Sequence, residues 1–160
     1  MSATASYAAE GGCTCRGVRY RLSATPLIVH CCHCHWCQRE TGSAFALNAL
    51  IESSCVALLT GQPEYVPLPS NSGKGQQVAR CPQCRIALWS YYSGLGAVMS
   101  FVRAGTLDEP ERLPPPVHIY TESKQPWVVL PADARAFSQY YKSREVWSAE
   151  SLARRQSLLG

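Results

Sequence analysis

The stretch His30–Glu40, HCCHCHWCQRE, places four cysteines and three histidines within eight positions, from His30 to Cys37. Thiol and imidazole groups at this density are typical of a disulfide framework or of a metal site. The chain has 160 residues, of which 46% are hydrophobic, and nine cysteines, an odd number. A chain of this size can bury its own core, so it does not need disulfides in order to fold. The stretch therefore predicts reduced thiols that bind a metal.

Length and charge give the setting for this stretch. A chain of 160 residues predicts one domain, and its net charge of +4 is spread along the sequence, with only Arg154 and Arg155 forming a local basic pair. Nucleic-acid binding is therefore not expected. The N-terminal residues MSATASYAAEGG lack the basic start and apolar run of a signal peptide, and no window approaches a membrane span. We expect a cytoplasmic protein without membrane contact.

Short apolar segments, several of them alternating with polar residues, predict a mainly β fold. These segments are VRYRL (18–22), AFALNALI (44–51), EYVPL (64–68), ALWSYY (87–92), VMSFVRAG (98–105), VHIY (117–120) and PWVVL (126–130). Turn and loop signals such as GQP (61–63), PSNSGKG (69–75) and SGLG (93–96) separate them. Helical patterning is expected only late, at 132–143 and at 148–159, where Ser148 can cap the N-terminus.

The other cysteines supply a second candidate metal site. Residues i and i+2 of a strand point to the same face, so Cys13 and Cys15 in CTC offer two ligands. Cys-x-x-Cys on a tight turn, here Cys81 and Cys84 in CPQC, offers two more. Together they predict a closed, structural four-cysteine zinc site whose binding energy contributes to folding.

The central stretch then retains Cys32, Cys34 and Cys37, three ligands that leave the fourth corner of a zinc tetrahedron open. An open corner is the mark of a catalytic zinc, whereas a saturated one is structural. Spacing alone also allows Cys34 and Cys37 to join CPQC and leave CTC aside. For Cys31 and Cys55 we expect core packing.

Two other roles of CPQC find little support. In thioredoxin-like proteins the first cysteine opens a helix, whereas here RIALWSYY follows and predicts a strand. Zinc deaminases combine His-x-Glu with Pro-Cys-x-x-Cys, and neither pattern occurs in this chain. A metal site remains the favoured interpretation.

Four stretches in this order resemble the glutathione-dependent formaldehyde-activating enzyme family, whose domain also occurs in centromere protein V. They are GGCTCRGVRY (11–20), CCHCHWCQRETGSAFA (31–46), SGKGQQVARCPQCRIALWS (72–90) and VHIYTESKQPWVVLP (117–131). The resemblance covers about residues 11–147. The first family motif usually reads CxCG, whereas here Arg16 precedes Gly17, a departure that we expect to shift only a turn.

The resemblance implies a zinc-binding β-tent of small antiparallel sheets with two zinc ions per chain. A structural zinc would match Cys13, Cys15, Cys81 and Cys84, and a catalytic zinc would match Cys32, Cys34 and Cys37. The implied activity is that of a carbon–sulfur lyase, the reversible joining of glutathione and formaldehyde. Three thiolates leave Zn²⁺ with a formal charge of −1, which suits a substrate thiol better than an activated water.

Docking and proton transfer can be assigned to candidate residues. Because glutathione carries two carboxylates, Arg39 and Lys74 are expected to bind it near the central stretch. His33, His35, His118 and Arg39 are unranked candidates for the proton donor. The two other functions to test are a non-catalytic zinc-binding interaction module and an enzyme of this fold that acts on another thiol adduct or carbonyl compound.

The expected organisation is a flexible tail over residues 1–10, the zinc-binding domain over 11–147 and a helical extension over 148–160. This extension could support a homodimer.

Overall fold

The computed structural model describes residues 6–160, in which eleven strands and three α-helices are present. The strands are β1 (Ala9–Gly12), β2 (Arg19–Leu22), β3 (Ile28–Cys32), β4 (Ala46–Glu52), β5 (Val56–Thr60), β6 (Glu64–Leu68), β7 (Gln76–Arg80), β8 (Ala87–Tyr92), β9 (Met99–Arg103), β10 (Val117–Ile119) and β11 (Arg135–Ala136). The helices are α1 (His35–Thr41), α2 (Ser143–Val146) and α3 (Ala149–Leu159). Short 3₁₀ turns lie at Ser53–Cys55, Gly96–Val98, Ala104–Thr106, Pro110–Arg112 and Thr121–Ser123.

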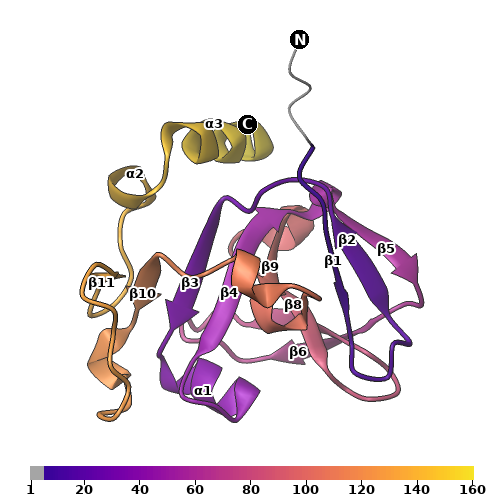
Figure 1. Ribbon diagram of the computed structural model, residues 1–160, viewed down its shortest axis with the longest axis horizontal. Coiled ribbons are helices and arrows are strands. Elements are labelled where there is room, and N and C mark those ends of the chain that lie inside the picture. The colour runs from indigo at the N-terminus through magenta and orange to yellow at the C-terminus, as the bar shows by residue number, and fades with distance from the viewer. Residues whose placement is uncertain (1–5) are drawn as a thin grey trace.

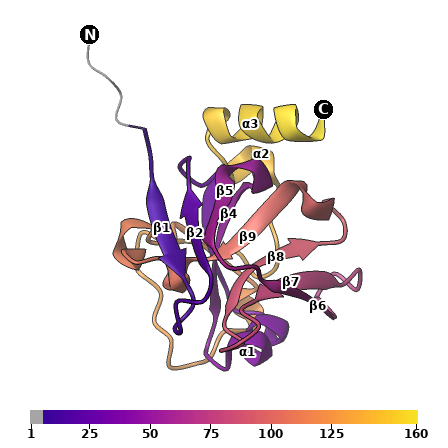
Figure 2. The same cartoon turned by 90° about the vertical axis from the view of Figure 1, so that its right-hand side faces the viewer.

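The strands form two sheets, which Figures 1 and 2 show from two directions. A three-stranded antiparallel sheet has the order β1-β2-β5, and an eight-stranded sheet has the order β11-β10-β3-β4-β9-β8-β7-β6. Neighbours in the larger sheet are antiparallel, except that β10 pairs in parallel with both β3 and β11. The predicted mainly β fold is confirmed.

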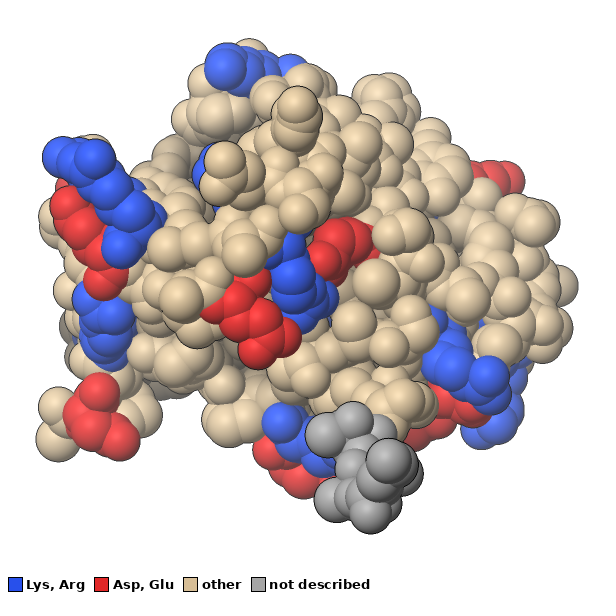
Figure 3. All heavy atoms as spheres, turned by 90° about the horizontal axis from the view of Figure 1, so that it is seen from above, with Lys and Arg blue, Asp and Glu red and all other residues tan. Residues whose placement is uncertain are grey.

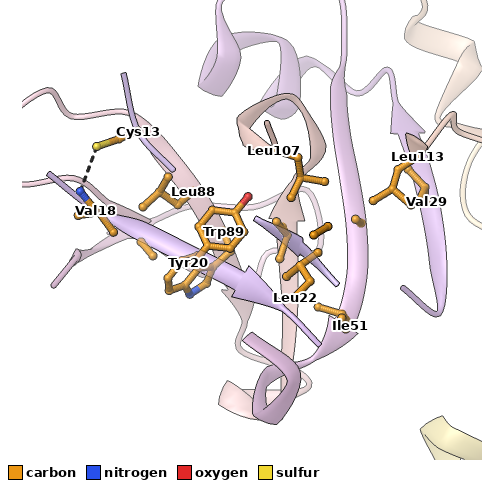
Figure 4. Packing of buried hydrophobic residues seen from close by; sticks show 14 of the residues in the cluster. Cys13, Val18, Tyr20, Leu22, Val29, Ile51, Leu88, Trp89, Leu107 and Leu113 are labelled. Carbon is orange, nitrogen blue, oxygen red and sulfur yellow. Dashed lines mark hydrogen bonds between the residues drawn. The ribbon is translucent and has the colours of Figure 1, made fainter. Parts of the chain in front are cut away.

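One hydrophobic core joins the two sheets (Figure 4). Tyr20 of β2 and Trp89 of β8 meet edge to face, with ring centroids 5.6 Å apart. The hydroxyl of Tyr20 is hydrogen-bonded to Thr106 at 2.7 Å, so this buried polar group is satisfied. Ile51 of β4 is fully buried in the same core. Burying an aliphatic or aromatic side chain of this size contributes about 1.5–3 kcal/mol.

The opposite face of the eight-stranded sheet carries a second core, which the C-terminal segment covers. Successive residues of a strand point to opposite faces, so Leu50 faces this core while Ile51 faces the first. Met99 and Ile119 join Leu50 from the sheet, and Trp147 packs on them from the C-terminal segment. The larger sheet is therefore covered by apolar side chains on both faces.

Polar anchors fix α3 above this second core, where Figure 1 shows the helix next to β3. The hydroxyl of Ser148 accepts a hydrogen bond from the backbone N–H of Ser151, so the predicted N-cap is confirmed. Ser151 in turn donates to the carbonyl of Leu27 at 2.8 Å. Arg154 binds both carboxylate oxygens of Glu52, at 2.8 and 2.7 Å. These contacts set which side chains of the C-terminal segment face the sheet.

The helix expected at residues 132–143 is wrong. This segment runs extended beside the end of β10, and it exchanges backbone hydrogen bonds with it. Phe137 N–H donates to the carbonyl of His118 at 3.0 Å, and Tyr120 N–H donates to that of Gln139 at 3.1 Å. Backbone groups that pair between segments are not available for the i to i−4 bonds of a helix. Tertiary pairing therefore overrides the helical pattern.

The strand expected at 126–130 is also wrong. A turn forms here instead, in which the Lys124 ammonium donates to the carbonyl of Val128 at 2.6 Å. Trp127 and Val129 are 73% and 89% exposed. An apolar run becomes a strand only where a neighbouring strand pairs with it, and the segment has no such neighbour in the described chain.

The tail expected over residues 1–10 lies half outside the described residues. Ala9 and Glu10, its last two residues, already belong to β1 and pair with Leu22 and Arg21 of β2.

Candidate metal centres and cavity

A four-cysteine cluster (Cys13, Cys15, Cys81 and Cys84) lies where the turn after β1 meets the turn after β7. The four sulfur atoms lie within 4.8 Å of one another, and the sulfur of Cys15 is 3.5 Å from that of Cys13 and 3.6 Å from that of Cys81. Four thiolates bound to one zinc at tetrahedral corners are separated by about 3.8 Å. Donor type and spacing therefore fit zinc. The structure thus brings together the four cysteines that the sequence assigns to the structural site.

The backbone around this cluster is adapted to the sulfur atoms. Backbone N–H groups of Cys15 and Ile86 lower the pKa of Cys84 to about 6, which favours the thiolate that a metal requires. Arg16 and Arg85, which follow the second cysteine of each pair, adopt left-handed backbone with φ of 63° and 65°. A side chain at Gly17 would lie 3.2 Å from the sulfur of Cys15. Arg16 stands at the glycine position of the CxCG motif, and its left-handed backbone is one that favours glycine.

A three-cysteine cluster (Cys32, Cys34 and Cys37) forms where β3 ends and α1 begins, and its sulfur atoms also lie within 4.8 Å of one another. Cys34 is the N-cap of α1, and its sulfur accepts the backbone N–H of Cys37 at 3.4 Å. Gly42, with φ of 66°, ends the helix. This short helix was not expected from the sequence. Its first turn folds Cys37 back toward Cys32, which an extended chain would not do.

The three thiols differ in acidity because they share hydrogen bonds. Contacts from Cys32 and Cys37, with backbone N–H groups of Trp36 and Cys37, lower the pKa of Cys34 to about 3. The hydrogen bond with Cys34 raises the pKa of Cys32. Cys34 is therefore the first of the three to ionise. Within residues 6–160, no further His, Cys, Asp or Glu ligand atom joins this group, so its donor set fits a zinc that keeps one open position.

A buried guanidinium lies beside this cluster and contributes positive charge to the surroundings of Cys37. The side chain is that of Arg103, which is 7% exposed and donates to the amide oxygen of Asn48. Its Nη2 atom is 3.8 Å from a carboxylate oxygen of Glu40, which Arg80 also binds at 2.7 Å. Two arginines and one glutamate leave an excess positive charge, which opposes the negative charge of three thiolates.

The three-cysteine cluster opens into a cavity of about 330 Å³ between the eight-stranded sheet and the C-terminal segment. Its sheet side is mostly apolar and aromatic, formed by Leu50, Tyr92, Met99, Phe101 and Ile119, with His30, Asn48 and Gln76 as the polar strand residues. Uncharged polar groups of the loop at residues 70–72 line another side. A cavity of this size and composition, next to a few reactive groups, is typical of a small-molecule site.

His30 is the histidine that lines this cavity, and it is held by a buried hydrogen-bonded chain. Its Nε2 is hydrogen-bonded to the hydroxyl of Tyr141, to which the indole N–H of Trp147 donates at 2.7 Å. Because Trp147 occupies the hydroxyl oxygen, the proton of Tyr141 is free to be donated to His30. Burial lowers the pKa of His30 to about 4, so the ring is neutral at pH 7.

The other histidines lie elsewhere. His33 and His118 form a buried histidine cluster with Cys31, in which His33 Nε2 is 3.5 Å from the Cys31 sulfur and 2.9 Å from His118 Nδ1. None of these three lines the cavity, and His35 is exposed on α1. Their candidacy as proton donors therefore finds no support in the geometry. The core role expected for Cys31 agrees with its burial.

The two residues expected to bind glutathione are both exposed. Arg39 lies on α1 and Lys74 in the loop between β6 and β7, and neither lines the cavity. Their role stays a prediction. Instead, Arg155 of α3 lines the cavity. Among the described residues of the cavity wall, it is the one with a charged side chain. Figure 3 shows the face that carries α3, where basic and acidic side chains lie in mixed groups separated by uncharged surface.

Sequence reasoning missed His30, Tyr141 and Arg155 as site residues. His30 offered a signal, because it lies two positions before Cys32 and shares its strand face. Tyr141 and Arg155 offered none, since they are more than 100 residues from the three-cysteine cluster in the sequence. Tertiary packing brings Tyr141 to His30 and Arg155 to the cavity wall.

Three comparisons relate the chain to known proteins. A comparison with family models matches residues 8–123 to the family described as glutathione-dependent formaldehyde-activating enzyme. No curated protein matches the chain. Among solved structures, the chain is similar to the crystal structure of a Rhodobacter sphaeroides protein, with 18% identity and a TM-score of 0.47, covering 62% of this chain and 87% of that one.

No helix within residues 6–160 combines the length and apolar character that crossing a membrane requires.

The family match spans most of the chain and includes the four-cysteine and three-cysteine clusters. The chain therefore belongs to the glutathione-dependent formaldehyde-activating enzyme family.

Proposed function

We propose that the protein is a zinc-dependent carbon–sulfur lyase that joins a thiol, such as glutathione, reversibly to formaldehyde or a related aldehyde. The observation that carries this proposal is the position of the three-cysteine cluster. Its three thiols lie in the wall of a largely apolar cavity, and no fourth protein ligand joins them in residues 6–160. A structural zinc site would have a fourth protein ligand and would need no cavity beside it.

Two zinc ions per chain are part of the proposal. The four-cysteine cluster would hold a structural ion that links the turns after β1 and β7. The three-cysteine cluster would hold the second ion, which would supply a Lewis acid that favours the thiolate form of a substrate thiol. The buried Arg103 guanidinium, held by Asn48 and Glu40, offsets part of the negative charge of the three thiolates.

The reaction itself needs no oxidant or reductant. The thiol sulfur forms a bond to the carbonyl carbon, the carbon–oxygen double bond becomes single, and the thiol proton ends on the oxygen. The reverse reaction breaks the carbon–sulfur bond and returns the proton to sulfur. The chain therefore has to orient two reactants and hold one proton near the oxygen.

Side chains of the cavity support these tasks. Tyr92 lines the cavity and packs edge to face on Phe101, with centroids 4.5 Å apart, which fixes its ring. Burial raises the pKa of Tyr92 above the ordinary value of tyrosine, so its phenol is protonated at neutral pH. We assign to it the hydrogen bond that stabilises the negative charge developing on the aldehyde oxygen. The apolar wall excludes water, which strengthens that bond.

Replacing Cys34 tests the proposal. The wild type should contain two zinc ions and accelerate exchange between formaldehyde, thiol and adduct, measured by NMR exchange spectroscopy with glutathione and with simpler thiols. Cys34→Ser should stay folded, lose one zinc and lose the acceleration. Cys55→Ser is the matched control, because Cys55 lies in a 3₁₀ turn outside both clusters. A folded Cys34→Ser protein that lacks one zinc but keeps full activity would contradict the catalytic role.

A further inference from the structure

The charges that line the cavity define which thiol it can accept. Glutathione carries two carboxylates and one ammonium group at neutral pH. Among the described residues that line the cavity, Arg155 is the charged one, and no carboxylate is present to meet an ammonium. Burying a charge without a partner of opposite charge is costly, so the cavity matches one carboxylate well and offers the other two charges only uncharged polar groups.

Arg155 is positioned to bind that carboxylate. Its guanidinium lies over the ring of Trp147, 5.9 Å from the centroid, and both side chains line the cavity. Its neighbour Arg154 is engaged by Glu52, whereas no ion pair forms at Arg155 within residues 6–160. An unpaired, half-buried guanidinium at the wall of a largely apolar cavity is well suited to a carboxylate, because charge-assisted hydrogen bonds strengthen as water is excluded.

The part of the wall that carries Arg155 lies outside the family match. The family match ends at residue 123, and four lining residues lie beyond it. They are Tyr140, Ser143, Trp147 and Arg155. The cysteines and the sheet side of the cavity thus come from the family domain, whereas the side opposite the sheet comes from the C-terminal segment. This segment is therefore the place where substrate selection can differ without a change in the reaction.

We propose that the thiol partner of this protein is a mercapto acid with an aromatic or aliphatic body and a single carboxylate, which Arg155 binds, and not glutathione. The body packs on Phe101, Leu50 and Trp147, while the sulfur reaches the three-cysteine cluster. This inference rests on the proposed function, since it assumes that a thiol enters this cavity. It names the substrate class for the same site.

Ligand binding can be measured without turnover. Cobalt(II) in place of zinc absorbs in the visible and near-ultraviolet, and a new sulfur ligand changes that spectrum. The probes are 4-(mercaptomethyl)benzoate, the neutral phenylmethanethiol and glutathione, titrated into cobalt-loaded wild type and variants. We expect the benzoate to bind at least about tenfold more tightly than glutathione. Arg155→Gln should weaken the benzoate by about tenfold and leave phenylmethanethiol unchanged.

Two further variants make the test specific. Arg144→Gln removes the same charge from an exposed position in the same C-terminal segment, outside the cavity, and should change neither affinity. Arg155→Glu should reverse the preference, so that 4-(mercaptomethyl)benzylamine binds more tightly than the benzoate. Metal content and melting temperature confirm that each variant is folded.

The possible failures are distinguishable. Glutathione binding as tightly as the benzoate, or Arg155→Gln weakening the charged and neutral thiols equally, would overturn this inference and leave the proposed function in place. A cobalt spectrum that responds to none of the thiols would overturn the proposed function, and the inference with it.

Discussion

Cys31 and Cys32 are neighbours in β3, yet their side chains lie on opposite faces of the eight-stranded sheet and belong to different clusters. Cys32 lines the cavity, whereas Cys31 contacts His33 on the other face. The 2.9 Å between His33 Nε2 and His118 Nδ1 is the length of a direct hydrogen bond. Two nitrogens on one tetrahedral zinc lie about 3.3 Å apart. The histidine cluster is therefore best described as a hydrogen-bonded part of the core.

Because Cys31 and Cys32 belong to different clusters, their substitutions should affect zinc content differently. Cys32→Ser should lose one of two zinc ions, and Cys31→Ser should keep both, because only Cys32 belongs to a proposed zinc site. Zinc content of the purified variants, measured by inductively coupled plasma mass spectrometry, checks this. Loss of a metal ion from Cys31→Ser would show that the histidine cluster also binds metal.

Tyr141→Phe should destabilise the fold by about 1–3 kcal/mol, because it leaves the buried indole N–H of Trp147 and the ring of His30 without their partner. Urea unfolding of the zinc-loaded protein measures the change. The matched control is Tyr7→Phe, which removes a buried hydroxyl that has no hydrogen-bond partner in the described structure, so it should be neutral or stabilising. Equal losses in the two variants would mean that the buried chain has no special role.

The contact between Glu52 and Arg154 predicts a pH dependence of stability. Burial alone would raise the pKa of Glu52, but the hydrogen bonds and charge of Arg154 outweigh it, so the pKa lies below its ordinary value of 4.5. A depressed pKa in the folded state stabilises the protein above pH 4.5, and this stabilisation is lost as the pH falls through the folded value.

Glu52→Gln isolates this effect from the titration of the cysteines, which both proteins share. At pH 7 the variant should be less stable than wild type by about 1 kcal/mol, and the difference should shrink as the pH falls below 4.5 and through the lowered pKa of Glu52. Thermal unfolding across this range measures it. A difference that stays constant with pH would assign the loss to packing.

Arg16→Gly should stabilise the fold by about 0.5–1 kcal/mol. Arg16 is exposed and has φ of 63°, a conformation that disfavours residues with a Cβ atom. Arg16→Ala keeps the Cβ and removes the same charge, so it should give no gain. Denaturant unfolding at a fixed zinc concentration compares the two. Equal stabilisation by both substitutions would assign the effect to charge.

Tyr92→Phe should slow the exchange reaction at least about tenfold while zinc content stays at the wild-type level, because only the hydroxyl facing the aldehyde oxygen is lost. Tyr65→Phe is the control, since Tyr65 is 47% exposed on β6 and lies outside the cavity. Exchange rates and metal content of both variants show whether the Tyr92 hydroxyl takes part in the reaction. An unchanged rate in Tyr92→Phe would remove this residue from the proposed mechanism.

The sequence alone predicted much of the fold, because alternation and turn residues are local signals. The segments containing β2, β4, β6, β8, β9 and β10 follow from them, as does α3 with its Ser148 cap. The segment 132–143 could not be predicted, since its backbone partners lie at the end of β10. The apolar run 126–130 forms a turn because no strand of the described chain pairs with it. The sequence did not predict the helix α1, because the closely spaced cysteines and histidines around its start were interpreted as an extended segment of metal ligands.

The same division holds for the site. Cys13 with Cys15, and Cys81 with Cys84, are pairs whose local spacing suits two ligands of one metal, but the same spacing allowed Cys34 and Cys37 to join Cys81 and Cys84. The tertiary structure decided which pairs meet. It also decided what surrounds them. The pairing of β10 with β3 places His118 beside Cys31, and the packing of α3 brings Arg155 to the cavity of Cys32. Neighbours along a chain constrain one another through a few bond rotations, whereas residues more than 80 positions apart meet only through strand register and core packing.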